Sequence, residues 1–116
     1  MKRILIVDDD IGSRESLRLT FSRHYQTLLA ENAAAANRLL AQQRVDIVLL
    51  DVLMPEKDGV TLLKEIHEHY PDMPCVMVSA SANVRPVVEA MKAGAHDFVI
   101  KPFDVEEIRR IVARAL

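Results

Sequence analysis

The segment Ile47–Pro55 reads IVLLDVLMP: four apolar residues run directly into a single carboxylate, and a proline follows. An apolar run this short and rich in branched residues is typical of a strand buried on both faces, as in a parallel sheet. Asp51 then lies at the C-terminal end of that strand. In open α/β sheets ligands bind just outside the carboxyl ends of the strands, so Asp51 is a candidate for chemistry. An aspartate that only starts a turn is the simpler alternative.

The composition is typical of one globular domain. Half of the 116 residues are hydrophobic and 28% are charged, with three Gly and five Pro. A net charge of −2 argues against direct nucleic-acid binding, because domains with that role are usually basic. No apolar run approaches a membrane span, and the N-terminal run is too short for a signal peptide, so we expect a cytoplasmic protein. Cys75 stands alone among apolar neighbours, which predicts a buried thiol.

Four other apolar runs have the length of a strand. The first also ends in acid, because Ile4–Val7 is followed directly by Asp8-Asp9-Asp10. The other three are Thr27–Ala30, Cys75–Val78, which Ser79 follows, and Phe98–Ile100, which Lys101-Pro102 follows.

Helical patterns separate these runs. The expected helices are Ser13 to about Ser22, Ala33–Gln42, a segment from Val60 that stops before Pro71, one from about Val84 that ends before Gly94, and one from Val105 to Leu116. Asp10 or Ser13 can cap the first helix and Asn32 the second. Five strands alternating with five helices predict an α/β fold, a doubly wound five-stranded parallel sheet with helices on both faces, in a single domain over residues 1–116. The last residues show no cap, which fits the N-terminal part of a longer protein.

The carboxyl edge of this sheet collects polar residues. They are Asp8, Asp9, Asp51, Ser79 and Lys101. Clustered carboxylates repel one another unless a cation neutralises them, and two or three acids suit Mg²⁺, a hard ion that keeps several waters. A bound Mg²⁺, an ammonium and a hydroxyl can hold three phosphoryl oxygens while one carboxylate attacks phosphorus. The pattern therefore predicts phosphoryl transfer to an aspartyl nucleophile.

These residues resemble the receiver domains of bacterial two-component response regulators. The matching elements are Val7-Asp8-Asp9, Asp51-x-x-Met54-Pro55-x-x-x-Gly59, Ser79-Ala80, Gly94-Ala95-x-Asp97-Phe98 and Lys101-Pro102-Phe103. They run from the first strand to the last helix in the order of that family, and their joint occurrence is specific. The resemblance implies the flavodoxin-like strand order 2-1-3-4-5.

The resemblance also implies a role for each acid. Asp51 would accept a phosphoryl group from a phosphohistidine of a sensor histidine kinase or phosphotransfer protein. Asp9 would bind Mg²⁺ directly, together with Asp51 and the backbone carbonyl of Leu53. Asp8 would act mainly through a metal-bound water.

Three further residues would sense the phosphoryl group. Lys101 would pair with it, with a cis bond between Lys101 and Pro102. Ser79 would move to hydrogen-bond a phosphoryl oxygen, and Phe98 would swing inward behind it. Many relatives carry Tyr where this chain has Phe98, so a signal that needs a phenolic hydroxyl is not expected.

The implied function is a phosphorylation-operated switch and not an enzyme. The switch would control an output domain or partner protein, and segment 88–95 looks like receivers that precede transcription-activating ATPase or DNA-binding domains. Arg109, Arg110 and Arg114 put positive charge on the last helix, either as a solvated face or as the contact of a phosphorylation-dependent homodimer.

Hydrolases of the haloacid-dehalogenase type are the alternative from another class, because they also use an aspartyl nucleophile and Mg²⁺. Asp8-Asp9-Asp10 offers their Asp-x-Asp spacing, with Asp8 as the nucleophile. However, Gly12 stands where those enzymes have Thr or Val, and the chain is too short for a cap domain. Flavin binding on the same fold is disfavoured, since an acidic first loop would repel the cofactor's phosphate.

Two smaller expectations concern the histidines and the approach of water to the phosphoryl group. His67 and His69 are two residues apart on a helix, so they cannot share a face to bind metal, and we expect them at the surface. We expect His96 at the surface as well. Leu53 and Ser81 would border the approach of water to the phosphoryl group in a receiver. Since the apolar Leu53 cannot orient a water, we expect slow dephosphorylation.

Overall fold

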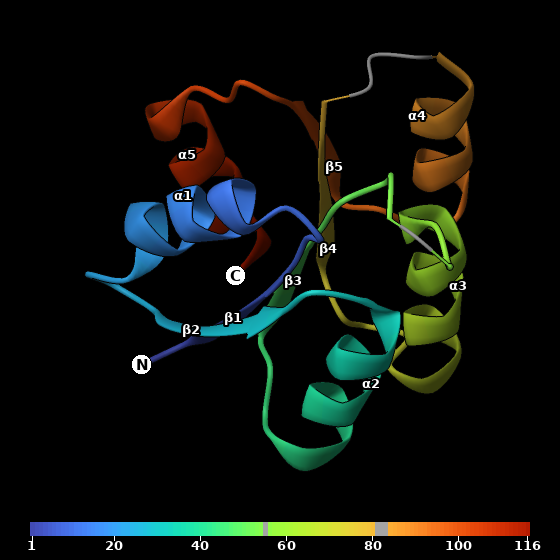
Figure 1. Cartoon of the computed structure of the whole chain (residues 1–116), viewed down its shortest axis with the longest axis horizontal. Helices are drawn as coiled ribbons and strands as arrows, with labels where there is room; N and C mark the ends of the chain where they lie inside the picture. The colour runs from blue at the N-terminus through green and yellow to red at the C-terminus, as the bar shows by residue number, and fades with distance from the viewer. Residues whose placement is uncertain (55, 81–83) are drawn as a thin grey trace.

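The computed structural model describes residues 1–54, 56–80 and 84–116, and within them five parallel strands form one sheet. The strand order is β2-β1-β3-β4-β5, which confirms the predicted order 2-1-3-4-5 (Figure 1). The strands are β1 (Arg3–Val7), β2 (Gln26–Ala30), β3 (Ile47–Leu50), β4 (Cys75–Ser79) and β5 (Asp97–Ile100).

Helices cover both faces of the sheet. They are α1 (Ile11–Phe21), α2 (Ala33–Gln42), α3 (Gly59–His69), α4 (Val84–Lys92) and α5 (Val105–Ala115). α1 and α5 lie on one face, and α2, α3 and α4 lie on the other (Figure 1). The doubly wound α/β fold is therefore confirmed. Among the described residues, no helix combines the length and the apolar character that a membrane crossing requires.

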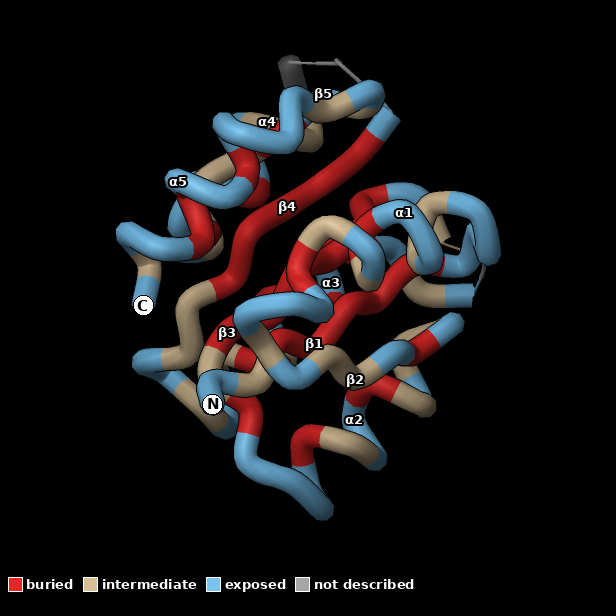
Figure 2. Tube along the Cα trace, turned by 90° about the vertical axis from the view of Figure 1, so that its left-hand side faces the viewer, coloured by how far each residue is buried: buried red, intermediate tan, exposed pale blue. Residues whose placement is uncertain are grey.

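The core is split by the sheet into two apolar clusters. Side chains alternate between the faces of a strand, so Ile4 and Ile6 of β1 pack with α1 and α5, while Leu5 and Val7 pack on the opposite side. β1, β3 and β4 form a continuous buried band in Figure 2. This band explains why the central strands read as unbroken apolar runs and not as alternating ones.

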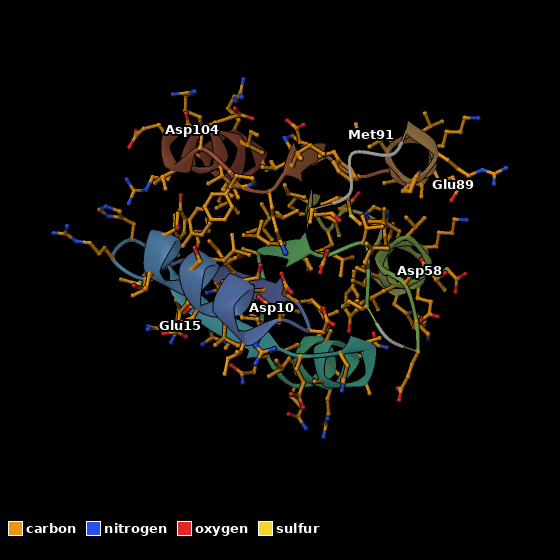
Figure 3. All side chains as sticks on the ribbon, turned by 45° about the horizontal axis from the view of Figure 1, so that its top comes forward. Asp10, Glu15, Asp58, Glu89, Met91 and Asp104 are labelled. Atoms are coloured by element: carbon orange, nitrogen blue, oxygen red, sulfur yellow. The ribbon has the colours of Figure 1, made fainter. Side chains whose placement is uncertain are left out.

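Aspartate or asparagine side chains cap four helices. The expected caps Asp10 and Asn32 accept hydrogen bonds from the backbone N–H groups of Ser13 and Ala35, both over 2.8 Å. Asp58 and Asp104 begin α3 and α5 in the same way. Figure 3 shows Asp10, Asp58 and Asp104 at the starts of their helices.

One prediction about the histidines is wrong. His69 and His96 are exposed, as expected, but His67, in the last turn of α3, is half-buried against the residues that follow α4. Its Nδ1 lies 3.1 Å from the carbonyl oxygen of Ala93, and its Nε2 lies 2.9 Å from that of Met73. Gly94 packs closely against this ring, because a Cβ there would lie 3.1 Å from the imidazole, tighter than most Cβ contacts. Sequence spacing alone did not reveal that the ring serves carbonyls from two other segments.

Candidate functional site

The site lies where β1 and β3 end side by side. Past the last residues of these strands, the backbone N–H of Asp8 donates to Ala30 over 3.1 Å, and that of Asp51 donates to Val7 over 2.9 Å. The sheet ladder therefore extends to both aspartates and fixes where their side chains begin. Central strands buried on both faces are the most rigid support that this fold offers.

Three of the predicted carboxylates converge at this edge. Asp8, Asp9 and Asp51 each offer an oxygen within 4.8 Å of the others. Asp8 is 1% exposed and Asp51 is 7% exposed, whereas Asp9 is exposed. Three anions this close, two of them buried, require positive charge beside them.

Lys101 supplies part of that charge from the end of β5. Its backbone N–H donates to the carbonyl of Ser79 over 2.9 Å, and the Lys101–Pro102 peptide bond is cis. The ammonium reaches across β4 to the acids, with Nζ 2.7 Å from Oδ2 of Asp8 and 3.8 Å from Oδ2 of Asp51. In this arrangement the hydrogen bond goes to Asp8, and Asp51 receives only a longer-range attraction.

Asp8 has both carboxylate oxygens in hydrogen bonds. Oδ2 accepts from Lys101, and Oδ1 accepts from the backbone N–H of Asp10 over 2.9 Å. A buried carboxylate whose two oxygens both accept hydrogen bonds, one of them from an ammonium, is held in one orientation. Its geometry is that of a fixed charge.

Asp51 is bonded more loosely. Its Oδ1 accepts a long hydrogen bond of 3.4 Å from the backbone N–H of Leu53. Burial raises the pKa of this carboxyl to about 6, against the opposing attraction of Lys101 and with added repulsion from Asp8 and Asp9. Near neutral pH Asp51 is therefore mainly an anion with weak hydrogen bonds, which is the condition of an available nucleophile.

The close packing around Gly59 shows why the motif that follows Asp51 has a glycine at this position. A Cβ at this position would lie 1.9 Å from the backbone oxygen of Asp51, closer than any real contact. The N–H of Gly59 donates to Val52 over 2.8 Å, so α3 begins directly against the backbone that carries the nucleophile. The glycine is needed for this close approach.

Ser79 and Phe98 lie on one face of the sheet, beside the acids. Ser79 is fully buried at the end of β4 and lies opposite Ile100 in the sheet register. Phe98 lies opposite Met77, two residues earlier, and is half-buried against the core on the α2, α3 and α4 face. Leu53, by contrast, is 60% exposed at the rim. Pro55 and Ser81 lie outside the described residues.

One further residue, which the sequence pattern does not predict, contacts the acidic turn. Arg14, on the first turns of α1, donates from Nη1 to the backbone carbonyl of Asp8 over 2.8 Å. From the sequence, an arginine on an amphipathic helix is expected to be a solvated charge. In the folded chain the Arg14 side chain instead extends to the acidic residues that follow β1.

A hollow of about 540 Å³ opens beside Lys101. It lies between α1 and the segment after β5, and its walls include Ser13, Ser16 and Phe103.

The carboxylate cluster consists of oxygen donors only, which is the chemistry that a hard divalent cation such as Mg²⁺ prefers. The donor set therefore fits that ion.

Known proteins share this sequence pattern. The family model described as the response regulator receiver domain matches residues 4–113. The regulatory protein AtoC of Escherichia coli (strain K12) is 44% identical over 117 residues, covering 100% of this chain and 25% of AtoC. The response regulator protein PilR of Pseudomonas aeruginosa is 37% identical over 116 residues, covering 99% of this chain and 26% of PilR. The chain thus spans about a quarter of the length of these relatives.

Solved structures share the fold. The receiver domain of NtrX from Brucella abortus superposes with a TM-score of 0.93 at 33% identity and covers 97% of both chains. The chemotaxis protein CheY4 of Vibrio cholerae superposes with a TM-score of 0.93 at 26% identity, covering 100% of this chain and 99% of that chain.

Proposed function

The chain belongs to the response regulator receiver domain family, and from this we propose that it is a switch operated by phosphorylation of Asp51. The observation that supports this assignment best is the contrast within the acidic cluster. Asp8 has both oxygens in hydrogen bonds, whereas Asp51, at the end of the central strand, keeps a weakly bonded carboxylate near the Lys101 ammonium.

In the proposed reaction, an Asp51 carboxylate oxygen attacks the phosphorus of a phosphohistidine. The new O–P bond forms as the N–P bond breaks, and the electron pair leaves with the imidazole nitrogen, which takes a proton. The histidine belongs to a sensor kinase or a phosphotransfer protein. We place the approach of that partner at the hollow beside Lys101, whose walls come from α1 and the segment after β5.

Mg²⁺ would be held by Asp9 and Asp51 and by the carbonyl of Leu53, with Asp8 acting through water. When bound, this ion supplies the positive charge that neutralises the phosphoryl oxygens. Lys101 has a separate task in the proposal. It exchanges its bond with Asp8 for one with the phosphoryl group, and this adds a second cation to the transferred charge.

Ser79 and Phe98 would convert the new charge into a change of shape. Ser79 hydrogen-bonds a phosphoryl oxygen in this proposal, and Phe98, now half-buried, moves further inward on the same sheet face. A ligand that interacts differently with two arrangements shifts their populations, and the phosphoryl group acts as that ligand. The product is a changed surface and not a released molecule, so we propose that the domain, residues 1–116, works as a switch.

An output domain or partner protein would read this surface. Transcriptional control is the output that we favour, because a related protein carries the name transcriptional regulatory protein KdpE of Staphylococcus aureus and is 34% identical over 116 residues. A phosphorylation-dependent homodimer is a further form that such an output can take.

The hydrolase alternative is not favoured. It requires Asp8 to attack phosphorus, but Asp8 is 1% exposed and its two oxygens accept hydrogen bonds from Asp10 and Lys101. A nucleophile with no weakly bonded oxygen would have to break one of these bonds first.

Labelling with a small phosphodonor tests the proposal. Acetyl phosphate with Mg²⁺ should label the chain on Asp51, and Asp51→Asn should abolish the label while circular dichroism shows an intact fold. Asp8→Asn should retain measurable labelling. Removal of Mg²⁺ by a chelator should stop the labelling of the wild-type chain. Labelling that persists in Asp51→Asn and disappears in Asp8→Asn would support the hydrolase instead.

A further inference from the structure

Arg14 connects the first helix to the last residue before the acidic turn. Its Nη1 lies 2.8 Å from the backbone carbonyl oxygen of Asp8, and the side chain is half-buried. A charged donor to a carbonyl makes a stronger hydrogen bond than a neutral one. The bond spans six residues of chain and joins α1 back to the end of β1.

The carbonyl that Arg14 binds lies beyond the paired part of β1. The described register of β1 ends at Val7, which pairs with Ala30 on one side and with Leu50 on the other. Asp8 still donates its N–H to Ala30, and its carbonyl accepts from the Arg14 side chain. A backbone carbonyl in a buried residue requires a donor, and Arg14 provides one.

The remaining bonds of the turn form a nested set. The N–H of Asp10 donates to Oδ1 of Asp8, and the N–H of Ser13 donates to Oδ2 of Asp10. The N–H of Arg14 donates to the carbonyl of Asp10 over 3.0 Å. Asp9 therefore lies between two residues that are each bonded through side chain and backbone. The hydrogen bond from the Arg14 side chain to the Asp8 carbonyl adds a direct link between α1 and the end of β1.

We propose that Arg14 is a positioning residue that holds the β1–α1 turn, residues 8–10, in one geometry before any cation binds. The carboxylates of Asp8 and Asp9 are then presented together at the cluster with Asp51. The cation-binding consequence rests on the proposed function, whereas the order of the turn does not. Preorganised ligands bind more tightly because less conformational entropy is lost on binding.

The proposed reaction makes this role more important. Lys101 holds Oδ2 of Asp8 in the structure, but it leaves for the phosphoryl group in the proposed mechanism. The turn then loses one bond at its first residue and keeps the one from Arg14. A guanidinium remains charged at every physiological pH, so this support does not depend on protonation.

Arg14 acts by position and not by charge at the nucleophile. The charged groups that shift the pKa of Asp51 are Lys101, Asp8 and Asp9, and Arg14 is not among them. Its Nη1 faces a carbonyl oxygen. Lysine at this position would keep the charge and one donor, so Arg14→Lys should rescue part of the effect of Arg14→Met.

The same helix offers a matched control. Arg18 lies one turn further along α1. Among the described residues, its guanidinium bonds only the side chain of Glu15, with Nε 2.9 Å from Oε1. Figure 3 shows Glu15 further from the start of the helix than Asp10. Arg18→Met therefore removes an equal side chain from the same helix and leaves the acidic turn unchanged.

Amide hydrogen exchange in metal-free protein tests the position of the turn. The N–H of Asp10 should exchange about tenfold faster in Arg14→Met than in wild type, because its acceptor Asp8 is no longer fixed. Arg18→Met should leave the rate within about twofold, and Arg14→Lys should lie between. Amides of β3 should be unchanged in all three, which shows that the effect is local. Equal rates for Arg14→Met and Arg18→Met would overturn the proposal.

Magnesium titration by NMR tests the consequence for binding. Arg14→Met should weaken Mg²⁺ affinity about tenfold, a size typical for residues that orient a ligand from behind, whereas Arg18→Met should not. If the wild type itself binds no Mg²⁺, the proposed function fails, and the exchange experiment still decides the role of Arg14. If Arg14→Met proves unfolded, Arg14→Lys against Arg18→Lys gives the same comparison, and equality within this pair overturns the proposal.

Discussion

Two turns meet at the carboxyl edge of the sheet, and they treat the same residue type in opposite ways. In the β1–α1 turn, Asp8 is almost fully buried and both of its oxygens accept short hydrogen bonds. In the β3–α3 turn, Asp51 is nearly as buried but accepts one long bond of 3.4 Å, and its pKa is raised to about 6. The two carboxylates therefore differ in how firmly their oxygens are hydrogen-bonded and hardly at all in their exposure to solvent.

The largest effect should come from Gly59, which shapes the β3–α3 turn. In Gly59→Ala the new Cβ would meet the Asp51 backbone oxygen at 1.9 Å, so α3 or the nucleophile must move. We expect a loss of about 3 kcal/mol or more in the free energy of unfolding and a matching loss of phosphorylation. Urea denaturation checks this. Gly12→Ala is the control, because there the nearest atom is a side-chain oxygen at 3.3 Å; equal losses in both variants would contradict the steric argument.

Replacement of Lys101 tests whether the buried carboxylate of Asp8, in the β1–α1 turn, needs a cation beside it. Lys101→Met leaves Asp8 buried without its cation, so the free energy of unfolding should fall by about 3 kcal/mol at pH 7.5 without metal. Lys57→Met is the matched control, since Lys57 pairs with Glu65 at 2.7 Å in a half-exposed place. There we expect less than about 1 kcal/mol. Similar losses in the two variants, measured by urea denaturation, would show that Asp8 needs no cation.

The raised pKa of Asp51 should make the stability of the folded chain depend on pH. Its pKa is about 6 in the folded chain against 3.8 as the ordinary value, so the folded state binds the proton more tightly. The resulting stability is present below pH 3.8 and is lost as the pH rises through about 6. Asp51→Asn has no carboxyl at this position, so its stability does not fall in this way as the pH rises. Without metal, the free energy of unfolding of Asp51→Asn relative to wild type should increase by about 1 kcal/mol between pH 5 and pH 7.5.

Urea denaturation of both proteins at the two pH values measures that growth. Asp72→Asn serves as the control, because Asp72 is an exposed carboxylate far along the chain from the cluster. An advantage for Asp51→Asn that stays constant with pH would mean that burial does not control the ionisation of Asp51.

The smallest effect concerns the exposed rim of the β3–α3 turn. Leu53 is 60% exposed next to the acceptor and cannot orient a water molecule. Leu53→Asn adds an amide, so phosphorylated Asp51 should hydrolyse about three- to tenfold faster, equivalent to about 1 kcal/mol of barrier. Half-lives under saturating Mg²⁺ measure this change. Leu53→Met is the apolar control, and indistinguishable half-lives for Asn and Met would remove Leu53 from the water path.

Patterns of apolar residues were sufficient to predict the fold. The five strands agree with the predicted runs to within one residue at each end. For β1, β3 and β4 the reason is that a strand buried on both faces must be apolar throughout and ends where a polar residue appears. The same rule located the site, since the residue that ends a buried parallel strand lies at the ligand edge. Asp10 as a cap and Cys75 as a buried thiol followed from local chemistry in the same way.

The partners of the polar side chains came only with the tertiary structure. Nothing in the order of residues indicates that Lys101 bonds Asp8 and lies further from Asp51, that Arg14 turns back to the carbonyl of Asp8, or that His67 faces carbonyls from two other segments. Apolar burial depends on a periodic pattern that sequence displays directly. A hydrogen bond depends on distances of a few tenths of an ångström between segments far apart in the chain, and only the packed fold sets those distances.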